Sequence, residues 1–231
     1  MADVMKIIVS FLKRALNVFF SHRCHLCNSV TEFKRSVCNN CAQKVSVVMG
    51  CPKPVFDTGF KGKIYTLSSY DGLVTDAIRI IKYKPSKCLL NELIQICLKV
   101  AGFEEFFRGD DVLVPAPMHY SRQKKRGFNQ AAEIAKAFAR KFNCQYAEPL
   151  IRVKAVKAQA ECTEKERRTN LENVFAISDD YLPEKFYGRR IIIIDDVATT
   201  GTTLLKCSQQ LEALNPSEII ALVITHSYKK K

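Results

Sequence analysis

The sequence predicts an α/β protein with a doubly wound parallel sheet, preceded by a small cysteine-rich segment. From about residue 63 onward, strand-like and helix-like patterns alternate along the 231-residue chain. The run Ile191–Ile194 is apolar at every position, which is expected of a central parallel strand covered by helices on both faces. Residues 21–51, in contrast, are polar and rich in cysteine. These observations predict a core that contains the sheet and a separate small segment on its N-terminal side.

The elements of the core follow from hydrophobic periodicity and from breaking residues. Strands are expected at residues 63–70, 111–118, 149–153, 174–178, 189–195 and 218–226, and helices at 75–84, 88–102, 129–142 and 201–215. Pro115 and Pro117 should stop the strand at 111–118, and Asn129 suits the N-cap of the helix that follows. Prolines and glycines at residues 51–63 favour a domain boundary there, so we expect domains at 21–51 and 63–231.

Residues 1–20 are expected to form an amphipathic helix. Its apolar side chains recur with a period of 3.6 residues: Val4, Ile7, Ile8, Phe11, Leu12, Ala15 and Phe19. A helix docked on the protein body is favoured over a membrane-surface helix, because the latter usually carries a longer basic face. No stretch reaches the roughly 18 apolar residues of a membrane span, so no transmembrane segment is expected.

Charge favours an anionic partner. The chain has 36 lysines and arginines against 23 acidic residues, a formal net charge of +13. Such a charge attracts polyanions through the summed field and the release of counterions. Nucleic acid or a phosphorylated substrate is therefore favoured, although a soluble basic surface without a specific partner has the same composition.

The ten cysteines do not indicate a secreted disulfide scaffold. Such scaffolds are short and enter through a signal peptide, and no small-residue cleavage site follows the N-terminal apolar segment. We therefore expect a reducing cytoplasm.

Four cysteines have the spacing of a metal site. Cys24 and Cys27 form one CxxC pair, and Cys38 and Cys41 form a second pair after ten intervening residues. Two such pairs complete the tetrahedral four-thiolate shell of structural Zn²⁺, whose binding supplies folding free energy. The alternatives are inert buried cysteines or a redox pair. The other cysteines are scattered and most simply fill the core: Cys51, Cys88, Cys97, Cys144, Cys162 and Cys207.

The segment after Ile191–Ile194 combines acidic and hydroxyl side chains. Asp195 and Asp196 end the expected strand, and a short loop then leads into a helix. The residues of this turn that suit a phosphate are Thr199, Thr200, Gly201, Thr202 and Thr203. Backbone N–H groups and a helix N-terminus favour an anion there, whereas carboxylates accept hydrogen bonds from sugar hydroxyls. A nucleotide hydrolase would need a GxxxxGK[ST] loop, which the chain lacks. An ordinary capped helix would not explain two adjacent carboxylates and four threonines.

This segment closely resembles the motif with which type I phosphoribosyltransferases bind 5-phosphoribosyl 1-pyrophosphate (PRPP). Upstream, VLVPAPMHYSRQKKRGFNQAAEIA and QAECTEKERRTNLENVF resemble the competence protein F (ComF) family, which also carries an N-terminal CxxC…CxxC knuckle. The resemblance extends from Cys24 to His226. It implies a type I phosphoribosyltransferase fold that takes PRPP, or another ribose 5-phosphate ligand, together with Mg²⁺.

The resemblance also implies roles for residues. Asp195 and Asp196 would contact the ribose hydroxyls, and the turn at residues 199–203 would hold the 5-phosphate. Pyrophosphate or DNA would contact a basic loop whose cations are Arg122, Lys124, Lys125 and Arg126, and the alternative is a solvated loop. Residues 159–170 resemble a mobile hood that closes over PRPP, with Arg167 or Arg168 as the catalytic cation. A surface helix that starts with a capping box at Thr163–Glu166 is the alternative there.

Three functions are compatible with these features. The first is a PRPP-binding protein of natural transformation, which handles incoming single-stranded DNA in the cytoplasm and has partners in the competence machinery. The second is an active transferase that moves ribose 5-phosphate from PRPP to a nitrogenous acceptor. The third is a transcription regulator, for which the sequence offers no recognition-helix signature.

Overall fold

The structure is a computed structural model that describes Met5 and residues 22–32, 35–55, 60, 62–68, 72–152, 174–181 and 183–226. Apart from Met5, the helix expected at residues 1–20 lies outside this range, as does the expected hood at 159–170. The chain divides into two compact units. The N-terminal unit comprises Met1–Met49 and Asp71–Val100, and the sheet unit comprises Gly50–Tyr70 and Ala101–Lys231. Two helices thus join the cysteine segment, whereas the boundary expected from the sequence precedes them.

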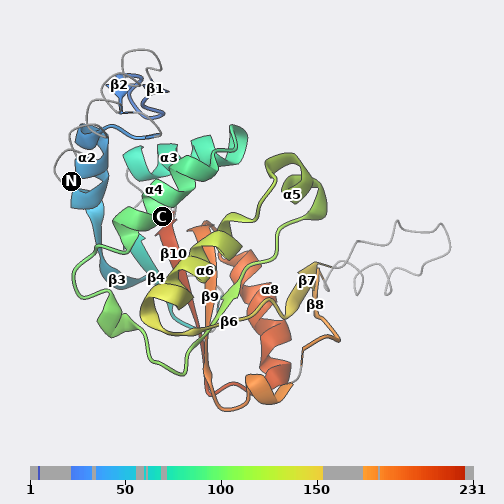
Figure 1. Ribbon diagram of the computed structural model, residues 1–231. Helices are drawn as coiled ribbons and strands as arrows, with labels where there is room; N and C mark the ends of the chain where they lie inside the picture. Colours follow the sequence, from blue (N-terminus) through green and yellow to red (C-terminus); the bar gives the residue numbers. More distant parts are fainter. Residues whose placement is uncertain are drawn as a thin grey trace, which may run out of the picture. The chain divides into compact units, whose positions relative to one another are not determined.

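The described part of the N-terminal unit comprises a short antiparallel ribbon and the helices α2, α3 and α4 (Figure 1). Its elements are β1 (His22–Arg23), β2 (Val30–Thr31), α2 (Asn39–Val48), α3 (Gly72–Tyr83) and α4 (Lys87–Cys97). The apolar side chains of α3 recur at helical spacing, and Val74, Ala77 and Ile81 are buried. Helix α2 packs against both α3 and α4, so the three helices form one small core.

A six-stranded sheet forms the centre of the other unit, in the order β3-β4-β10-β9-β5-β6. The strands are β3 (Met49–Val55), β4 (Ile64–Ser68), β5 (Val112–Pro115), β6 (Gln145–Tyr146), β9 (Arg190–Ala198) and β10 (Glu218–His226). Strand β9 is parallel to β5 and β10, β10 is parallel to β4, and β5 is parallel to β6. The predicted α/β fold with a parallel sheet is therefore confirmed.

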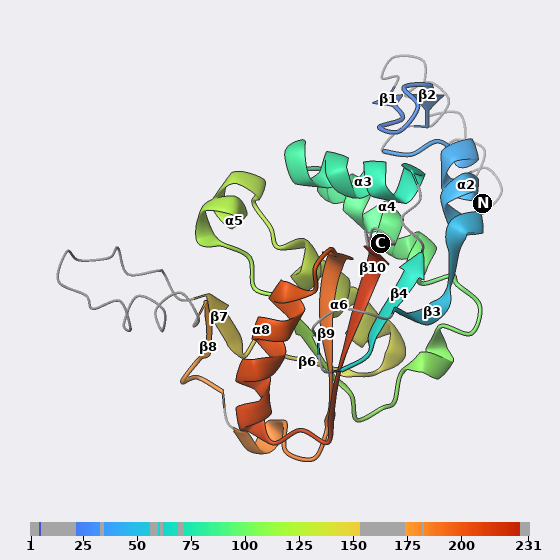
Figure 2. The same ribbon diagram turned by 180° about the vertical axis from the view of Figure 1, so that it is seen from behind.

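Helices of the sheet unit lie on both faces of this sheet (Figures 1 and 2). They are α5 (Tyr120–Arg126), α6 (Gln130–Phe142) and α8 (Thr202–Leu211), with 3₁₀ turns η1 (Glu104–Phe106), η2 (Pro183–Lys185) and η3 (Glu212–Leu214). Alternate residues of β9 point to opposite faces. Ile191 and Ile193 join the core cluster that contains Leu204 of α8, and all four isoleucines of Ile191–Ile194 are fully buried.

Three details differ from the sequence-based expectation. The strands expected at 149–153 and 174–178 form a separate antiparallel pair, β7 (Leu150–Arg152) and β8 (Phe175–Ile177), in which Ile151 and Arg152 are exposed. The basic segment after β5 is the helix α5 rather than a loop. Strand β9 continues through both aspartates to Ala198, because its pairing with β10 extends that far.

Among the described residues, no helix is long and apolar enough to cross a membrane.

Candidate functional site

The carboxyl ends of β5 and β9 lie next to each other at one edge of the sheet. The two strands are adjacent and parallel, so both chains leave the sheet at the same edge. After β5 the chain passes through α6 to β6 on one side, and after β9 it passes through α8 to β10 on the other. Connections that diverge in this way create a topological switch point, where open α/β sheets bind ligands.

The last part of β9 and the turn that leads to α8 carry the predicted carboxylates and hydroxyls at this edge of the sheet. Asp195 is partly exposed, Asp196 is buried, and the backbone N–H of Asp196 donates to Asp195 Oδ1 at 2.8 Å. Gly201 caps α8 with a left-handed backbone (φ 72°), a conformation that glycine adopts without a steric penalty. The hydroxyls of Thr200 and Thr202 lie 2.8 Å apart. The structure thus brings the residues predicted for ribose and phosphate together at one helix N-terminus, which favours an anion.

Hydrogen bonds fix the backbone of the residues that follow β5, beside the end of β9. The N–H of Ala116 donates to the carbonyl of Ile194 (2.8 Å), and Asn129 Nδ2 donates to the carbonyl of Ala116 (3.1 Å). The side-chain oxygen of Asn129 accepts from the N–H of Ala131, which confirms the predicted N-cap of α6. Phe128 is buried and packs in the interior. Asn129 and Phe128 therefore have structural roles here.

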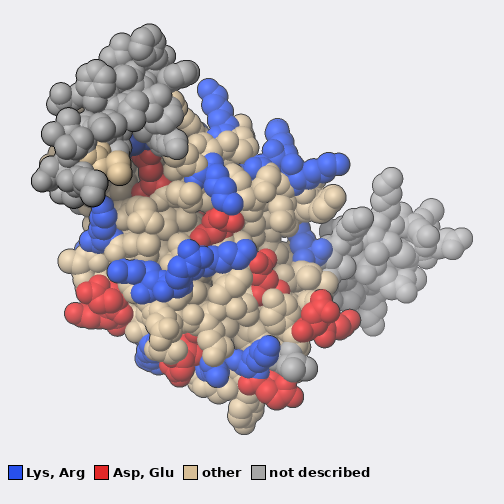
Figure 3. Space-filling model, in the orientation of Figure 1, with Lys and Arg blue, Asp and Glu red and all other residues tan. Residues whose placement is uncertain are grey.

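Helix α5 carries the four predicted cations. Arg122, Lys124 and Lys125 are exposed, whereas Arg126 is partly buried and donates to Gln130 Oε1 at 3.1 Å. Figure 3 shows lysine and arginine side chains gathered over α5. One α-helical turn spans 3.6 residues, so a seven-residue helix with four cations is basic around most of its circumference. The arrangement suits an extended anion such as pyrophosphate or a nucleic acid backbone.

Arg152, on β7, belongs to the same basic region and was missed by sequence reasoning. Burial lowers the pKa of Arg152, and the positive charge of Arg122 lowers it further. Its guanidinium also lies over the ring of Phe175, 5.6 Å from the centroid. The sequence did contain a signal for Arg152: it is a charged residue at the end of a short expected strand, shortly before the expected hood at residues 159–170. Arg167 and Arg168 lie outside the described residues, so their catalytic role stays a prediction.

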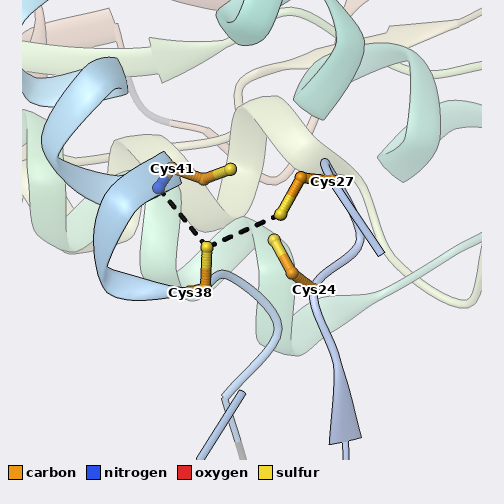
Figure 4. A group of neighbouring side chains, drawn as sticks. All are labelled: Cys24, Cys27, Cys38 and Cys41. Atoms are coloured by element: carbon orange, nitrogen blue, oxygen red, sulfur yellow. Dashed lines mark hydrogen bonds between the residues drawn. The ribbon is translucent and has the colours of Figure 1, made fainter. Parts of the chain in front are cut away.

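The second candidate site is the cysteine cluster of the N-terminal unit. The four Sγ atoms of Cys24, Cys27, Cys38 and Cys41 all lie within 4.8 Å of one another. Figure 4 shows the first pair on the turn after β1 and the second pair at the start of α2, with all four side chains converging. A tetrahedral Zn²⁺ with Zn–S bonds of about 2.3 Å needs sulfur atoms about 3.8 Å apart. The separation of 3.6 Å between the Sγ atoms of Cys27 and Cys38 fits this requirement.

Hydrogen bonds prepare two of the thiols for metal binding, since the thiolate is the ligand. The side chain of Ser29 lies 2.9 Å from Cys27 Sγ and lowers the pKa of Cys27 to about 6. The backbone N–H of Cys41 lowers the pKa of Cys38. Burial, in contrast, raises the pKa of Cys41, so a bound cation is needed to hold that sulfur as thiolate. The cluster therefore can bind one metal ion, and four protein ligands leave no open coordination position.

Helix α4 fixes the second half of this cluster. The carboxylate of Glu92 accepts hydrogen bonds from the N–H groups of Ser36 (2.7 Å) and Val37 (3.0 Å), the two residues before Cys38. No motif indicated Glu92, because its partners lie more than fifty residues away in the sequence.

Two of the remaining cysteines fill the core as predicted, and Cys144 is only partly buried. Cys97 and Cys207 are fully buried, and burial raises the pKa of both thiols, so they pack as neutral groups. Cys88 is exposed, and the core position expected for it is wrong, because it lies on the outer side of α4. Cys51 and Cys162 have side chains outside the described set.

Comparison with known proteins agrees with this geometry. Residues 124–231 match the family model of the phosphoribosyl transferase domain. The chain is 26% identical to competence protein F of Haemophilus influenzae over 85% of its own length and 81% of the relative's. It is 25% identical to the DNA utilization protein YhgH of Escherichia coli, over 81% and 83% of the two chains. Against competence protein ComFC of Bacillus subtilis the identity is 38% over 40% and 35% of the chains.

A solved structure of the allosteric regulatory enzyme of purine biosynthesis is 17% identical over 49% of this chain and 21% of that one, with a TM-score of 0.35. The sequence match to competence proteins covers most of the chain, and the matched phosphoribosyl transferase domain contains α6, β9, α8 and β10. In the order of its parts, a four-cysteine cluster followed by a phosphoribosyl transferase domain, and in its sequence over most of its length, the chain resembles the competence protein F family.

Proposed function

We propose that this protein binds PRPP at the carboxyl ends of β5 and β9, and that it handles single-stranded DNA during DNA uptake in the cytoplasm. The observation that carries the first half is the connection from β9 to α8: two carboxylates near the end of β9 are followed within a few residues by a helix N-terminus with hydroxyls, all within the matched phosphoribosyl transferase domain. A ribose 5-phosphate ligand has complementary groups, namely hydroxyls and a dianionic phosphate.

The proposed site divides the ligand between its two sides. Asp195 and Asp196 accept hydrogen bonds from the ribose hydroxyls, and residues 199–203 bind the 5-phosphate through N–H groups and hydroxyls. The pyrophosphate group extends toward α5, where Arg122 and its neighbouring cations neutralise it. Mg²⁺ would arrive with PRPP and neutralise part of the diphosphate charge. Structural Zn²⁺ at the four cysteines would stabilise the N-terminal unit.

The active-transferase alternative uses the same residues. The bond between C1 and the pyrophosphate oxygen breaks with its electron pair leaving on pyrophosphate, and a nitrogen of the acceptor forms the new bond to C1. Catalysis then consists of stabilising the departing pyrophosphate, for which α5, Arg152 and the arginines at 167 and 168 offer cations. No nucleophilic side chain is required.

The DNA half of the proposal draws on the names of the relatives and on charge. Relatives that match over four-fifths of the chain are named for competence and for DNA utilization. The net charge of +13 favours a polyanionic partner. Other competence proteins would be its partners in the same process.

One experiment separates binding from turnover. Zinc-loaded protein is incubated with PRPP, Mg²⁺ and a panel of nitrogenous bases and ammonia, and products are identified by mass spectrometry with and without protein. We expect PRPP binding by calorimetry in every case. A base-dependent loss of PRPP with a matching ribosyl product would establish the transferase, and the absence of any PRPP binding would refute both forms of the proposal.

A further inference from the structure

A groove of about 820 Å³ lies between the metal-binding turn and helix α3, and both of its walls belong to the N-terminal unit. One wall is the turn from Arg23 to Asn28, which contains the first CxxC pair. The other wall is the last part of α3 and the residue after it, namely Arg79, Ile80, Tyr83 and Lys84. The groove is separate from the proposed PRPP site, which is built entirely from the sheet unit.

The side chains of this groove are basic and aromatic. Arg23, Arg79 and Lys84 supply three cations, and none of the described residues that line the groove is acidic. The guanidinium of Arg23 donates to the carbonyl of Asn28 at 3.0 Å, which holds it along the turn and uses one of its five N–H groups. Arg79 is oriented by an exposed ion pair with Asp76 at 3.0 Å.

Tyr83 is the feature that helix packing does not explain. It is 78% exposed, whereas Val74, Ile78 and Ile81 of the same helix are buried. An exposed aromatic ring flanked by cations is what binds single-stranded nucleic acid, because the ring stacks on an unpaired base while the cations neutralise phosphates. An acidic peptide would use the cations alone.

We propose that this groove, between the turn Arg23–Asn28 and the end of α3, binds single-stranded DNA in addition to any contact made by the cations of α5, with Tyr83 stacking on a base and Arg79 and Lys84 contacting phosphates. The inference rests on the DNA-handling half of the proposed function and gives it a location. It also makes the metal cluster part of the interface, since Cys24 and Cys27 lie in the turn that forms one wall.

The test is fluorescence anisotropy of a labelled oligo-dT with the full-length, zinc-loaded protein, across a series of salt concentrations. We expect Tyr83→Ala to weaken binding roughly tenfold, as for loss of one stacked base, and Tyr83→Phe to bind as the wild type does. Each of Arg79→Gln and Lys84→Gln should reduce the slope of log K against log salt by about 0.7, the value for one phosphate contact with a single strand. These positions avoid the cysteines, and zinc content verifies that the cluster is intact.

A matched control changes the same residue types elsewhere. Lys185 and Tyr187 lie in the sheet unit, and both are exposed, so Lys185→Gln with Tyr187→Ala should leave DNA binding unchanged. If the α3 variants bind like this control while the wild type binds oligo-dT, the groove is wrong and the DNA-handling function stands. If the wild type fails to bind at low salt, both fail. Displacement of oligo-dT by poly-glutamate, with Tyr83→Ala indistinguishable from wild type, would assign the groove to acidic peptides and overturn the proposal.

Discussion

The guanidinium of Arg190 donates two hydrogen bonds to the carboxylate of Asp111, from Nε at 2.8 Å and from Nη2 at 2.6 Å. A third bond from Nη2 reaches the carbonyl of Phe106 at 2.9 Å. Asp111 is fully buried and Arg190 nearly so, and they stand at the beginnings of β5 and β9. The pair thus joins the amino ends of the two strands whose carboxyl ends form the proposed site.

Removing one member of this pair should destabilise the sheet unit strongly. In Asp111→Asn the guanidinium remains buried without its counter-charge, and we expect the free energy of unfolding to fall by about 3–5 kcal/mol. Hydrogen bonding to Asp111 raises the pKa of Arg190 in the native protein. In the variant the guanidinium still keeps its charge, because arginine does not lose its proton in proteins. Urea unfolding followed by circular dichroism measures the change. The double variant Asp111→Leu with Arg190→Leu is the control, and it should be less destabilised than Asp111→Asn. A stability equal to wild type in Asp111→Asn would contradict this view of the pair.

The cysteine cluster should bind about one Zn²⁺ per chain. We expect Cys24→Ser and Cys41→Ser to lose the metal and to reduce solubility, because zinc supplies folding free energy to a unit this small. Metal content by plasma mass spectrometry gives the stoichiometry, and Cys144→Ser is the matched control because its thiol lies in the sheet unit, outside the cluster. Full zinc occupancy in a variant lacking all four cysteines would end this assignment.

Glu92 should affect the same metal site without touching it. The N–H groups of Ser36 and Val37 donate to different oxygens of Glu92, and in Glu92→Gln one of these oxygens becomes an NH2 donor. One backbone N–H then faces a donor instead of an acceptor, so the segment before Cys38 is held less firmly. We expect zinc affinity to fall by roughly tenfold, as for outer-shell partners of metal sites. Competition with a chromogenic chelator measures it. Unchanged affinity would show that α2 alone positions the second CxxC pair.

The PRPP site predicts different effects for its two halves. Asp195→Asn with Asp196→Asn should weaken PRPP by roughly 1–3 kcal/mol, because the amides accept fewer hydrogen bonds from ribose, while binding of inorganic phosphate is retained. Gly201→Asp should abolish both, since a side chain at φ 72° is strained and the new charge repels phosphate. Calorimetric titration of PRPP, ribose 5-phosphate and phosphate with Mg²⁺ tests this. Wild-type affinity for PRPP in the double Asn variant would refute the ribose assignment.

Binding to single-stranded DNA should be weak, independent of sequence and steeply dependent on salt. Replacing Arg122, Lys124, Lys125 and Arg126 of α5 together with glutamine should flatten the salt dependence, because fewer counterions are released. Anisotropy with oligo-dT and with mixed-sequence oligonucleotides measures both properties. Binding that does not change with salt would contradict an electrostatic contribution from α5.

Cys144 offers a pH-dependent measurement. Burial, reinforced by the negative charge of Asp111, raises its pKa to about 11. Only the thiolate is alkylated, so the rate at Cys144 in native protein should keep rising about tenfold per pH unit from pH 8 to pH 10. In urea-unfolded protein the same rate should level off near the ordinary thiol pKa of about 8.5. Peptide mass spectrometry after iodoacetamide treatment follows both, and a plateau below pH 9 in the native protein would contradict the shift.

The sequence by itself determined the parts of this protein that depend on residues close together in the chain. Two CxxC pairs need only a turn and a helix start to bring their sulfur atoms together, and the pattern from Ile191 to Thr203 encodes a buried strand, its carboxylates and a helix N-terminus in consecutive positions. Asn129 could likewise be recognised as a cap, because its partner is two residues away. Local spacing is sufficient to predict these features, because all the groups that interact lie within a short stretch of the chain.

Tertiary structure alone decided which distant residues meet. Glu92 reaches Ser36 and Val37, and Arg190 reaches Asp111, across separations that no local pattern encodes. The isolation of the β7–β8 pair from the main sheet and the position of Tyr83 beside the metal-binding turn also depend on how elements pack. The physical reason is that packing selects one arrangement of elements from many with similar local propensities, and it does so through burial and hydrogen bonds that form only when the chain is folded.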